Sequence, residues 1–366
     1  MALKFWNRKD KEKPLKHKKS LAREWGDAVM FAVVFATIIR WSTFEAFAIP
    51  SSSMEKSLLT GDYLFVSKLH YGSRTPITPV QVPLTHQTIW GTNIPSYSDV
   101  IQLPYFRLPG FSEVKRNDAV VFNHPNEAER PIDLKTNLIK RCVGVAGDTI
   151  LIRQRQVYIN GKAAENPPNL QFSYFIRTDN VLNDKFFLKQ DITDVYPAQG
   201  GYYIHTIPEK AASFRSLNFI KEVKLLEALP GEAEPSVFPH EPAKYAWNQD
   251  NFGPLYIPKA GATINITPEI LPLYEKVLLT YEHNDNAEIN QGKLYMNGKE
   301  ISEYTFKQNY YFMMGDNRHN SNDSRYWGFV PEEYLVGKAV LVWMSVDSSA
   351  TFPDKIRWNR LFHTVN

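Results

Sequence analysis

Cysteine is almost absent from this chain of 366 residues, since Cys142 is its single example. One cysteine cannot form an intrachain disulfide, and it excludes a zinc site built on several cysteines. The nine histidines are scattered and no HExxH string occurs, which argues against the zinc-protease arrangement of two histidines on one helix face. No metal site is therefore expected.

An excess of basic over acidic residues is also absent outside the N-terminus. The formal net charge is +3, and the excess is concentrated before residue 24, at Lys4, Arg8, Lys9, Lys11, Lys13, Lys16, Lys18, Lys19 and Arg23. A nucleic-acid groove needs basic residues across the folded body, so no nucleic-acid partner is expected. The basic residues 1–24 are instead typical of a cytoplasmic tail that orients a membrane protein by the positive-inside rule.

The clearest apolar run covers residues 28–39, whose sequence AVMFAVVFATII contains no charge. Counting on to Phe47 gives about 20 residues, the length that spans about 30 Å of hydrocarbon. We predict a transmembrane anchor over residues 25–47, with Trp25 and Trp41 at the two interfaces. Two alternatives stay open: a buried core helix, because the strictly apolar part is short, and a cleavable secretory signal ending at 46–48 (Ala-Phe-Ala).

The sequence beyond the apolar run favours β structure. Short apolar runs at 63–66, 119–122 and 137–145 predict strands. Residues 72–112 are rich in Pro, Gly, Ser and Thr without an apolar period, which predicts an extended loop or meander. A charged stretch near 219–229 is the one helical-looking segment of the central region.

Two similar segments, 157–162 and 294–299, each contain the pattern YxNGK. Asn-Gly between alternating apolar residues is the strongest short hairpin signal, so both segments are predicted to be strands that end in a tight turn. Internal duplication and chance recurrence explain the pair equally well.

Three strings carry residue types with chemical potential. IPSSSM at 49–54, followed by Gly61-Asp62, places hydroxyl groups directly after the apolar run. LIKRCVG at 138–144 offers a lysine with apolar neighbours, and a serine nucleophile requires such a base. The third string, MGDNRHNSNDSRYWGFVP, occupies 314–331. In this order the three strings resemble type I signal peptidases, the membrane-bound Ser/Lys endopeptidases that remove secretory signal peptides.

The resemblance implies roles for single residues. Ser53 would be the nucleophile and Lys140 the general base, which requires burial to lower the lysine pKa from about 10.4. Ser321 would orient the lysine, and Ser51 would complete an oxyanion hole with the backbone N–H of Ser53. A supporting polar network would comprise Arg141, Asp316, Asp323 and Arg325. Shallow pockets for small substrate side chains would be lined by Ile49, Met54, Leu58 and Ile139.

The resemblance also implies an overall organisation. The fold would be mainly β: an antiparallel β-sheet catalytic domain of the signal-peptidase type, with a large β-rich insertion and one N-terminal transmembrane helix. The expected parts are a basic cytoplasmic tail (1–24), an anchor (25–47), a catalytic domain in two pieces (48–150 and 305–348), an inserted domain (151–304) and a C-terminal segment (349–366).

The same resemblance predicts a location and partners. The protein would cross the plasma (inner) membrane once, with a cytoplasmic N-terminus and the catalytic body on the outer face. It would act as a monomer on secretory preproteins, in contact with membrane lipid and without a cofactor.

Two other functions stay open. Ser53 and Lys56 form an SxxK string, which is also the nucleophile motif of penicillin-recognising enzymes, although neither KTG nor SDN occurs. The two enzymatic functions differ in the lysine that is essential. A signal peptidase would need Lys140, whereas a penicillin-recognising enzyme would need Lys56. The other alternative is a catalytically inactive, membrane-anchored β-rich binding or scaffold protein.

Overall fold

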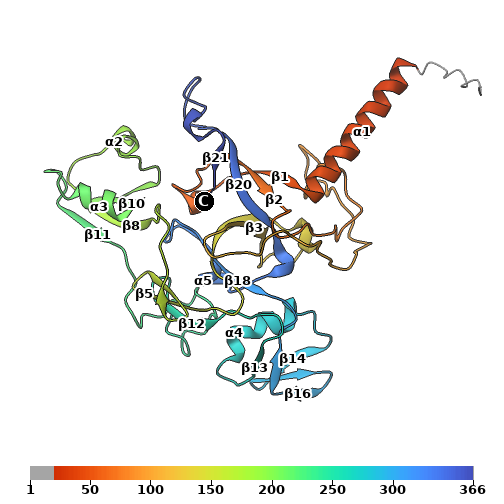
Figure 1. Ribbon diagram of the computed structural model, residues 1–366. Coiled ribbons are helices and arrows are strands. Elements are labelled where there is room, and N and C mark those ends of the chain that lie inside the picture. Colours follow the sequence, from red (N-terminus) through yellow and green to blue (C-terminus); the bar gives the residue numbers. More distant parts are fainter. Residues whose placement is uncertain (1–19, 366) are drawn as a thin grey trace, which may run out of the picture.

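The computed structural model describes residues 20–365. Residues 1–19, most of the predicted basic tail, lie outside the described residues, as does residue 366. The first helix, α1 (Leu21–Ser42), projects from the body of the molecule (Figure 1). The side chain of Ser20 caps it by accepting a hydrogen bond from the backbone N–H of Arg23, and none of its side chains is buried.

The predicted anchor over 25–47 differs from the structure at its distal end. Helix α1 stops at Ser42, and Phe44–Ala48 forms strand β1, which pairs antiparallel with β2 (Asp62–Ser67). Hydrogen bonding to a neighbouring strand replaces the helical hydrogen bonds there, so the prediction of a helix through residue 47 is wrong. No helix among residues 20–365 has both the length and the apolar character needed to cross a bilayer, and the anchor stays a prediction.

The largest sheet has eight strands and forms the centre of the molecule. Its order is β1-β2-β20-β3-β4-β18-β19, with β21 added alongside β20, and all of these pairs are antiparallel. The bounds not yet given are β3 (Ala119–Asn123), β4 (Asn137–Gly144), β18 (Tyr310–Met314), β19 (Val330–Pro331), β20 (Leu335–Ser345) and β21 (His363–Thr364). The three strands predicted at 63–66, 119–122 and 137–145 are confirmed within this sheet.

The strands of the central region form smaller sheets. One has the order β12-β5-β6-β7, from β5 (Thr149–Arg153), β6 (Gln156–Ile159), β7 (Lys162–Ala163) and β12 (Phe252–Tyr256). A second has the order β11-β8-β10-β9, from β8 (Phe172–Arg177), β9 (Val195–Ala198), β10 (Gly201–Thr206) and β11 (Glu222–Leu225). The others join β13 (Thr263–Asn265) to β17 (Glu303–Thr305), and β14 (Ala287–Asn290) through β15 (Lys293–Met296) to β16 (Lys299–Ile301).

The helices beyond α1 are short. Four are α-helical: α2 (Asp184–Lys189), α3 (Pro208–Phe214), α4 (Leu271–Lys276) and α5 (Ser324–Trp327). The single turns are η1 (Ser52–Met54), η2 (Ile132–Leu134), η3 (Val277–Tyr281), η4 (Glu332–Tyr334) and η5 (Trp358–Arg360). Within the described residues 72–112 there is no named helix or strand, as the sequence predicted. The molecule is therefore mainly β and antiparallel.

The prediction of two Asn-Gly hairpins is confirmed, whereas the prediction of a helix near 219–229 is wrong. Asn160-Gly161 joins β6 to β7 and Asn297-Gly298 joins β15 to β16, and all four residues have positive φ as such turns require. Residues 222–225 form strand β11 because pairing with β8 buries Val223. Tertiary pairing outweighs the local charge pattern at this point.

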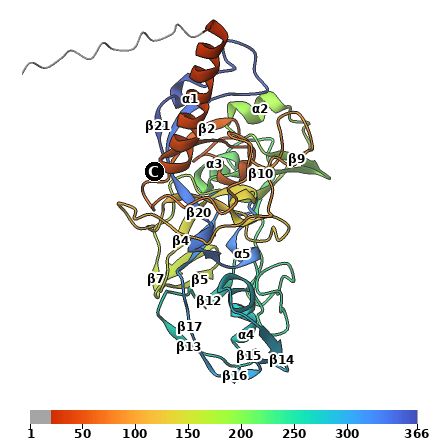
Figure 2. The ribbon, with the colours of Figure 1, turned by 90° about the vertical axis from the view of Figure 1, so that its right-hand side faces the viewer.

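Two hydrophobic cores support residues 151–304, the predicted insertion. The strands β8 to β11 and helices α2 and α3 share a core of their own. Figure 1 shows these elements to the side of the large sheet. The strands β5, β6, β12 and β15 instead share one core with β3, β4 and β18. Figure 2 shows α1 at one end of the molecule and the β14–β16 sheet at the other. The division of the chain at residues 151 and 304 stays a prediction.

Candidate active site

The serine loop, residues 49–62, connects β1 to β2 and carries Ser53 in the turn η1. Its two ends are tied together, because the backbone N–H of Ile49 donates to the carbonyl of Asp62 and that of Gly61 donates to the carbonyl of Ile49. Gly61 has a φ of +90°, and a Cβ there would lie 2.0 Å from the carbonyl oxygen of Val346. Only glycine fits this turn, which closes the loop and directs Ser53 inward.

Lys140 lies on β4, opposite Val120 of β3. Its Nζ is 2.7 Å from Ser53 Oγ and 3.1 Å from the carbonyl oxygen of Ile139. Ser53 is 9% exposed and Lys140 4% exposed. The structure thus brings the two predicted reacting residues together across 87 positions of sequence.

Burial sets the proton affinity of this lysine. It lowers the Lys140 pKa to about 8, although the nearby carboxylates of Asp323 and Asp316 act in the opposite direction. An ammonium group loses hydration when it is buried, so the neutral amine is favoured. A substantial fraction of the lysine is therefore neutral near physiological pH and able to take a proton from Ser53.

The GDN loop, residues 315–325, lies on the other side of the serine. A Cβ at Gly315 would lie 2.5 Å from the Ser53 carbonyl oxygen and 2.3 Å from Ser321 Oγ, so glycine permits this close approach. Ser321 is buried, and its Oγ has no hydrogen-bond partner among the described residues. Burial alone would raise the pKa of Asp323, but the charge and hydrogen bonds of Arg325 outweigh it and hold that pKa below its usual range. Among the described residues Lys140 donates only to Ser53 and Ile139, so the predicted bond from Ser321 to Lys140 is not present.

Two buried ion pairs brace the GDN loop. Arg141 donates through Nε and one terminal nitrogen to the two oxygens of Asp316, at 2.8 and 2.6 Å. Arg325 makes the same two-point contact with Asp323, at 2.8 Å for both bonds, and Asp323 also accepts from the backbone N–H of Gly315. The four residues predicted as a supporting network are thus all brought together. Paired charged hydrogen bonds of this kind fix orientation as well as distance.

A cleft of about 70 Å³ opens beside Ser53. Its lining includes Ser51 and Lys140, together with three of the four predicted pocket residues, Ile49, Met54 and Ile139. Leu58 does not line this cleft; it is 1% exposed and packs in the core beneath the serine loop. A small apolar cleft next to a serine suits an extended peptide with small side chains.

Sequence reasoning assigned no role to several residues that join the two loops. The backbone N–H of Asn317 donates to the Ser53 carbonyl at 3.1 Å, and its side-chain amide donates to the Ser52 carbonyl at 3.2 Å. Ser57 Oγ donates to Asp316 at 2.6 Å. Asn317 belongs to the GDN string, so the string itself was a signal for it, whereas nothing in the local sequence marks Ser57.

Lys56, the lysine of the SxxK string, is engaged elsewhere. It has a φ of +70°, and its Nζ forms an ion pair of 2.8 Å with Asp191 of the inserted region. No contact between Lys56 Nζ and Ser53 occurs within the described part of the chain. The geometry therefore supports Lys140 as the base.

No group of three or more His, Cys, Asp or Glu side chains within residues 20–365 is arranged to hold a metal ion.

Comparison with known proteins identifies relatives along most of the chain. Residues 22–197 and 275–344 match the family "Signal peptidase, peptidase S26". The chain is 30% identical over 334 residues to the signal peptidase I of Buchnera aphidicola subsp. Schizaphis graminum, which covers 90% of this chain and 77% of the relative. It is 27% identical over 345 residues to signal peptidase I of Haemophilus influenzae, with 92% and 73% covered, and 25% identical over 340 residues to that of Pseudomonas aeruginosa, with 90% and 75% covered.

Proposed function

Because the chain belongs to the signal peptidase family, peptidase S26, it is a serine endopeptidase of signal peptide processing, and we propose that Ser53 and Lys140 carry out the reaction. The observation that carries this proposal is the 2.7 Å contact between Lys140 Nζ and Ser53 Oγ inside a buried site. A serine becomes an effective nucleophile when an adjacent base removes its proton.

In the acylation step, neutral Lys140 takes the proton of Ser53 as the Oγ attacks the carbonyl carbon before the cleaved bond. The negative charge that develops on the carbonyl oxygen is stabilised by the backbone N–H of Ser53 and the hydroxyl of Ser51. When the tetrahedral intermediate collapses, the ammonium of Lys140 gives its proton to the departing amine, and the mature protein leaves.

Deacylation repeats these steps with water. Lys140, neutral again, removes a proton from a water molecule, and the resulting hydroxide attacks the ester carbon of Ser53. The signal peptide leaves with a free carboxyl group, and the proton returns to Ser53. Ser321 and the pairs Arg141–Asp316 and Asp323–Arg325 act by holding the loop beside the reacting pair.

The substrate would bind as an added strand between the end of β1 and the start of β4. In an extended peptide alternate side chains point the same way, so the first and third residues before the cut enter neighbouring pockets. Ile49, Met54 and Ile139 line the small cleft beside Ser53, which favours small side chains such as alanine. This supports cleavage after an A-x-A sequence.

The exposed surface of α1 supports attachment to a membrane. Its apolar side chains are solvent-exposed, including Val29, Phe31, Phe35 and Ile38, all at 50% or more. Apolar surface of this extent on one helix requires a covering, and lipid would supply it. We propose that the protein lies at the plasma membrane as a monomer with a cytoplasmic N-terminus. The catalytic region, residues 48–150 and 305–348, would lie on the outer face. Residues 151–304 would form an insertion in it.

The test is the mass of the products made from a secretory preprotein with an A-x-A site by the detergent-purified full chain. Wild type and Lys56→Ala are expected to cut after the final alanine, while Lys140→Ala loses about 10⁴-fold or more in rate, as removal of a catalytic base does in other serine hydrolases. Cleavage that survives Lys140→Ala, or depends on Lys56, would show that a different lysine is the base. Failure of wild type to cut would favour a binding or scaffold protein.

A further inference from the structure

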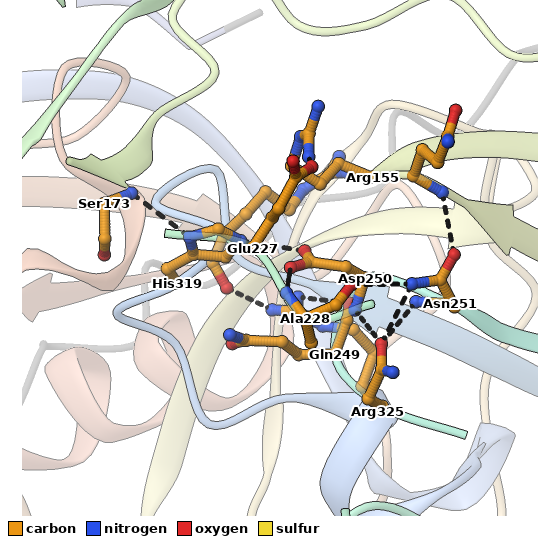
Figure 3. Close-up of polar contacts among 12 residues, drawn as sticks. Arg155, Ser173, Glu227, Ala228, Gln249, Asp250, Asn251, His319 and Arg325 are labelled. Carbon is orange, nitrogen blue, oxygen red and sulfur yellow. Dashed lines mark hydrogen bonds and ion pairs between the residues drawn. The ribbon is translucent and has the colours of Figure 1, made fainter. Parts of the chain in front are cut away.

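His319 lies inside the GDN loop, two residues before Ser321, and its side chain is 2% exposed. Figure 3 shows its ring between Ser173 of β8 and Asp250 of the segment before β12. His319 Nε2 is 2.8 Å from Asp250 Oδ1, and the backbone N–H of Ser173 donates to His319 Nδ1 at 3.2 Å. Both ring nitrogens are therefore used by residues of the inserted region.

These two contacts define the protonation of the ring. Since Nδ1 accepts a hydrogen bond, the ring proton is on Nε2, which donates it to Asp250. Burial alone would raise the pKa of Asp250, but the bond from His319 and the charge of Arg325 outweigh it and hold the pKa below its usual value. The ring thus meets one buried acceptor and one buried donor at the same time.

Asp250 is itself held firmly. Its second carboxylate oxygen accepts from the backbone N–H of Ala228 at 3.0 Å, and its own N–H donates to the side chain of Asn248. Arg325, at the end of the GDN loop, also donates to the carbonyl of Gln249 at 3.2 Å. Figure 3 shows these contacts as one continuous network. The segment 248–251 is therefore a fixed point against which the loop can be placed.

A second strip of the inserted region contacts the same loop. The backbone N–H of Gln171 donates to the carbonyl of Asp316 at 2.9 Å, and that of Arg318 donates to the carbonyl of Gln171 at 3.0 Å. On its opposite side the loop touches the nucleophile, since Asn317 donates to the Ser53 carbonyl. The loop is thus enclosed between the inserted region and the reacting serine.

We propose that the His319–Asp250 pair is a positioning device by which the inserted region holds the GDN loop in register with Ser53 and Lys140. The proposal rests on the function proposed above, and it makes residues 170–251 a determinant of the catalytic rate. Loss of the Nε2 donor leaves the Asp250 carboxylate buried with a missing partner. The loop then shifts to admit water, and a displacement of about 1 Å near the reacting groups costs up to about 100-fold in rate.

The test compares two substitutions, each of which preserves one of the two hydrogen bonds that the His319 ring makes. Glutamine places an amide donor near the position of Nε2, so His319→Gln can still bind Asp250. Asparagine places its amide near Nδ1, so His319→Asn keeps the contact to Ser173 and loses the donor. We expect kcat per folded protein to fall about 10- to 100-fold in His319→Asn, with KM nearly unchanged, and His319→Gln to recover most of the loss. Asp250→Ala, which removes the acceptor, should behave as His319→Asn does, and the double variant should be no worse than either.

His205→Asn is the matched control. His205 contacts Ser173 Oγ at 2.8 Å from β10, so it shares a partner with His319 but does not reach the GDN loop. Its kcat should stay within about twofold of wild type, because no hydrogen bond of the His205 side chain among the described residues reaches residues 315–325. A kcat for His319→Asn equal to that of His205→Asn, or a loss in His319→Asn that follows only the folded fraction measured by circular dichroism, would overturn the proposal.

Hydrogen exchange of peptides covering 315–325 separates this proposal from the proposed function. Exchange in these peptides should be faster in His319→Asn than in wild type and unchanged in His205→Asn, whether or not a preprotein is cut. Unchanged exchange in His319→Asn overturns the positioning role. Faster exchange together with an inactive wild type supports the positioning of the loop and overturns only the assigned reaction.

Discussion

The serine loop and the GDN loop meet at Ser53, yet they are held in different ways. The serine loop is fastened from outside by the C-terminal segment: Arg360 donates to Asp62 and to the Ser57 carbonyl. The side chain of Arg360 is 13% exposed. In the GDN loop the Asp323–Arg325 pair is almost completely buried, with side chains 0% and 1% exposed.

The difference shows how one site combines two kinds of support. Arg360 is partly exposed although its partner Asp62 is buried, so its loss weakens the serine loop but lets water reach the vacated position. A buried ion pair has no such substitute, and removing one partner leaves an uncompensated charge in the interior. The GDN loop is therefore expected to tolerate substitutions less well than the serine loop, and the following substitutions test this expectation.

Asp323→Asn should have the largest effect on stability. It removes the charge that balances Arg325 in a fully buried site, which costs about 3 to 5 kcal/mol. The measurement is the free energy of unfolding in urea of the detergent-purified chain. A loss below about 1 kcal/mol, the value typical of exposed pairs, would show that the GDN loop has no special dependence on burial.

Gly315→Ala should mainly reduce the rate. The new Cβ would lie 2.5 Å or less from the Ser53 carbonyl oxygen and Ser321 Oγ, so the two loops must separate, and a shift of about 1 Å costs about 100-fold in kcat. Gly26→Ala in α1 is the matched control, because no atom lies within 4 Å of a Cβ at that position. Equal kcat values for the two variants would contradict the close approach of the loops.

Arg360→Ala should have a smaller effect on stability than Asp323→Asn. It leaves the buried Asp62 with fewer donors, which costs about 1 to 3 kcal/mol, and water reaching the vacated position offsets part of this. Urea unfolding under identical conditions gives the comparison directly. If Arg360→Ala costs more than Asp323→Asn, the C-terminal segment, and not the buried pair, is the stronger brace.

The smallest expected effect is a shift in pH dependence. Lys140 acts when neutral and its pKa is about 8, so kcat/KM should fall as the pH is lowered through that value. Asp316 raises this pKa through its charge. Asp316→Asn also leaves the buried Arg141 with a missing partner, so the profile is measured on the folded fraction, where the acid limb should move to lower pH. A limb that stays in place would show that the GDN loop does not act on the lysine electrostatically.

The comparison also explains which parts of the molecule could be predicted. The strand at 137–145 and the two Asn-Gly hairpins follow from local patterns of apolar and turn residues. The end of α1 at Ser42 and the strand β11 were missed, since in both places pairing with a distant strand decides the conformation. The bond expected between Ser321 and Lys140 is absent from the described contacts, because the position of a side chain depends on the packing of the whole loop.

The sequence alone indicated the proposed reacting groups, because the strings around Ser53, Lys140 and the GDN loop contain the residue types that a serine and lysine mechanism requires. Only the tertiary structure decided that Lys140 is buried with a lowered pKa, that Lys56 pairs with Asp191, and that His319 meets Asp250. Burial and pairing depend on what surrounds a group in space, and those neighbours come from segments separated by tens to hundreds of residues. A motif specifies its own side chains, whereas their proton affinity and orientation belong to the fold.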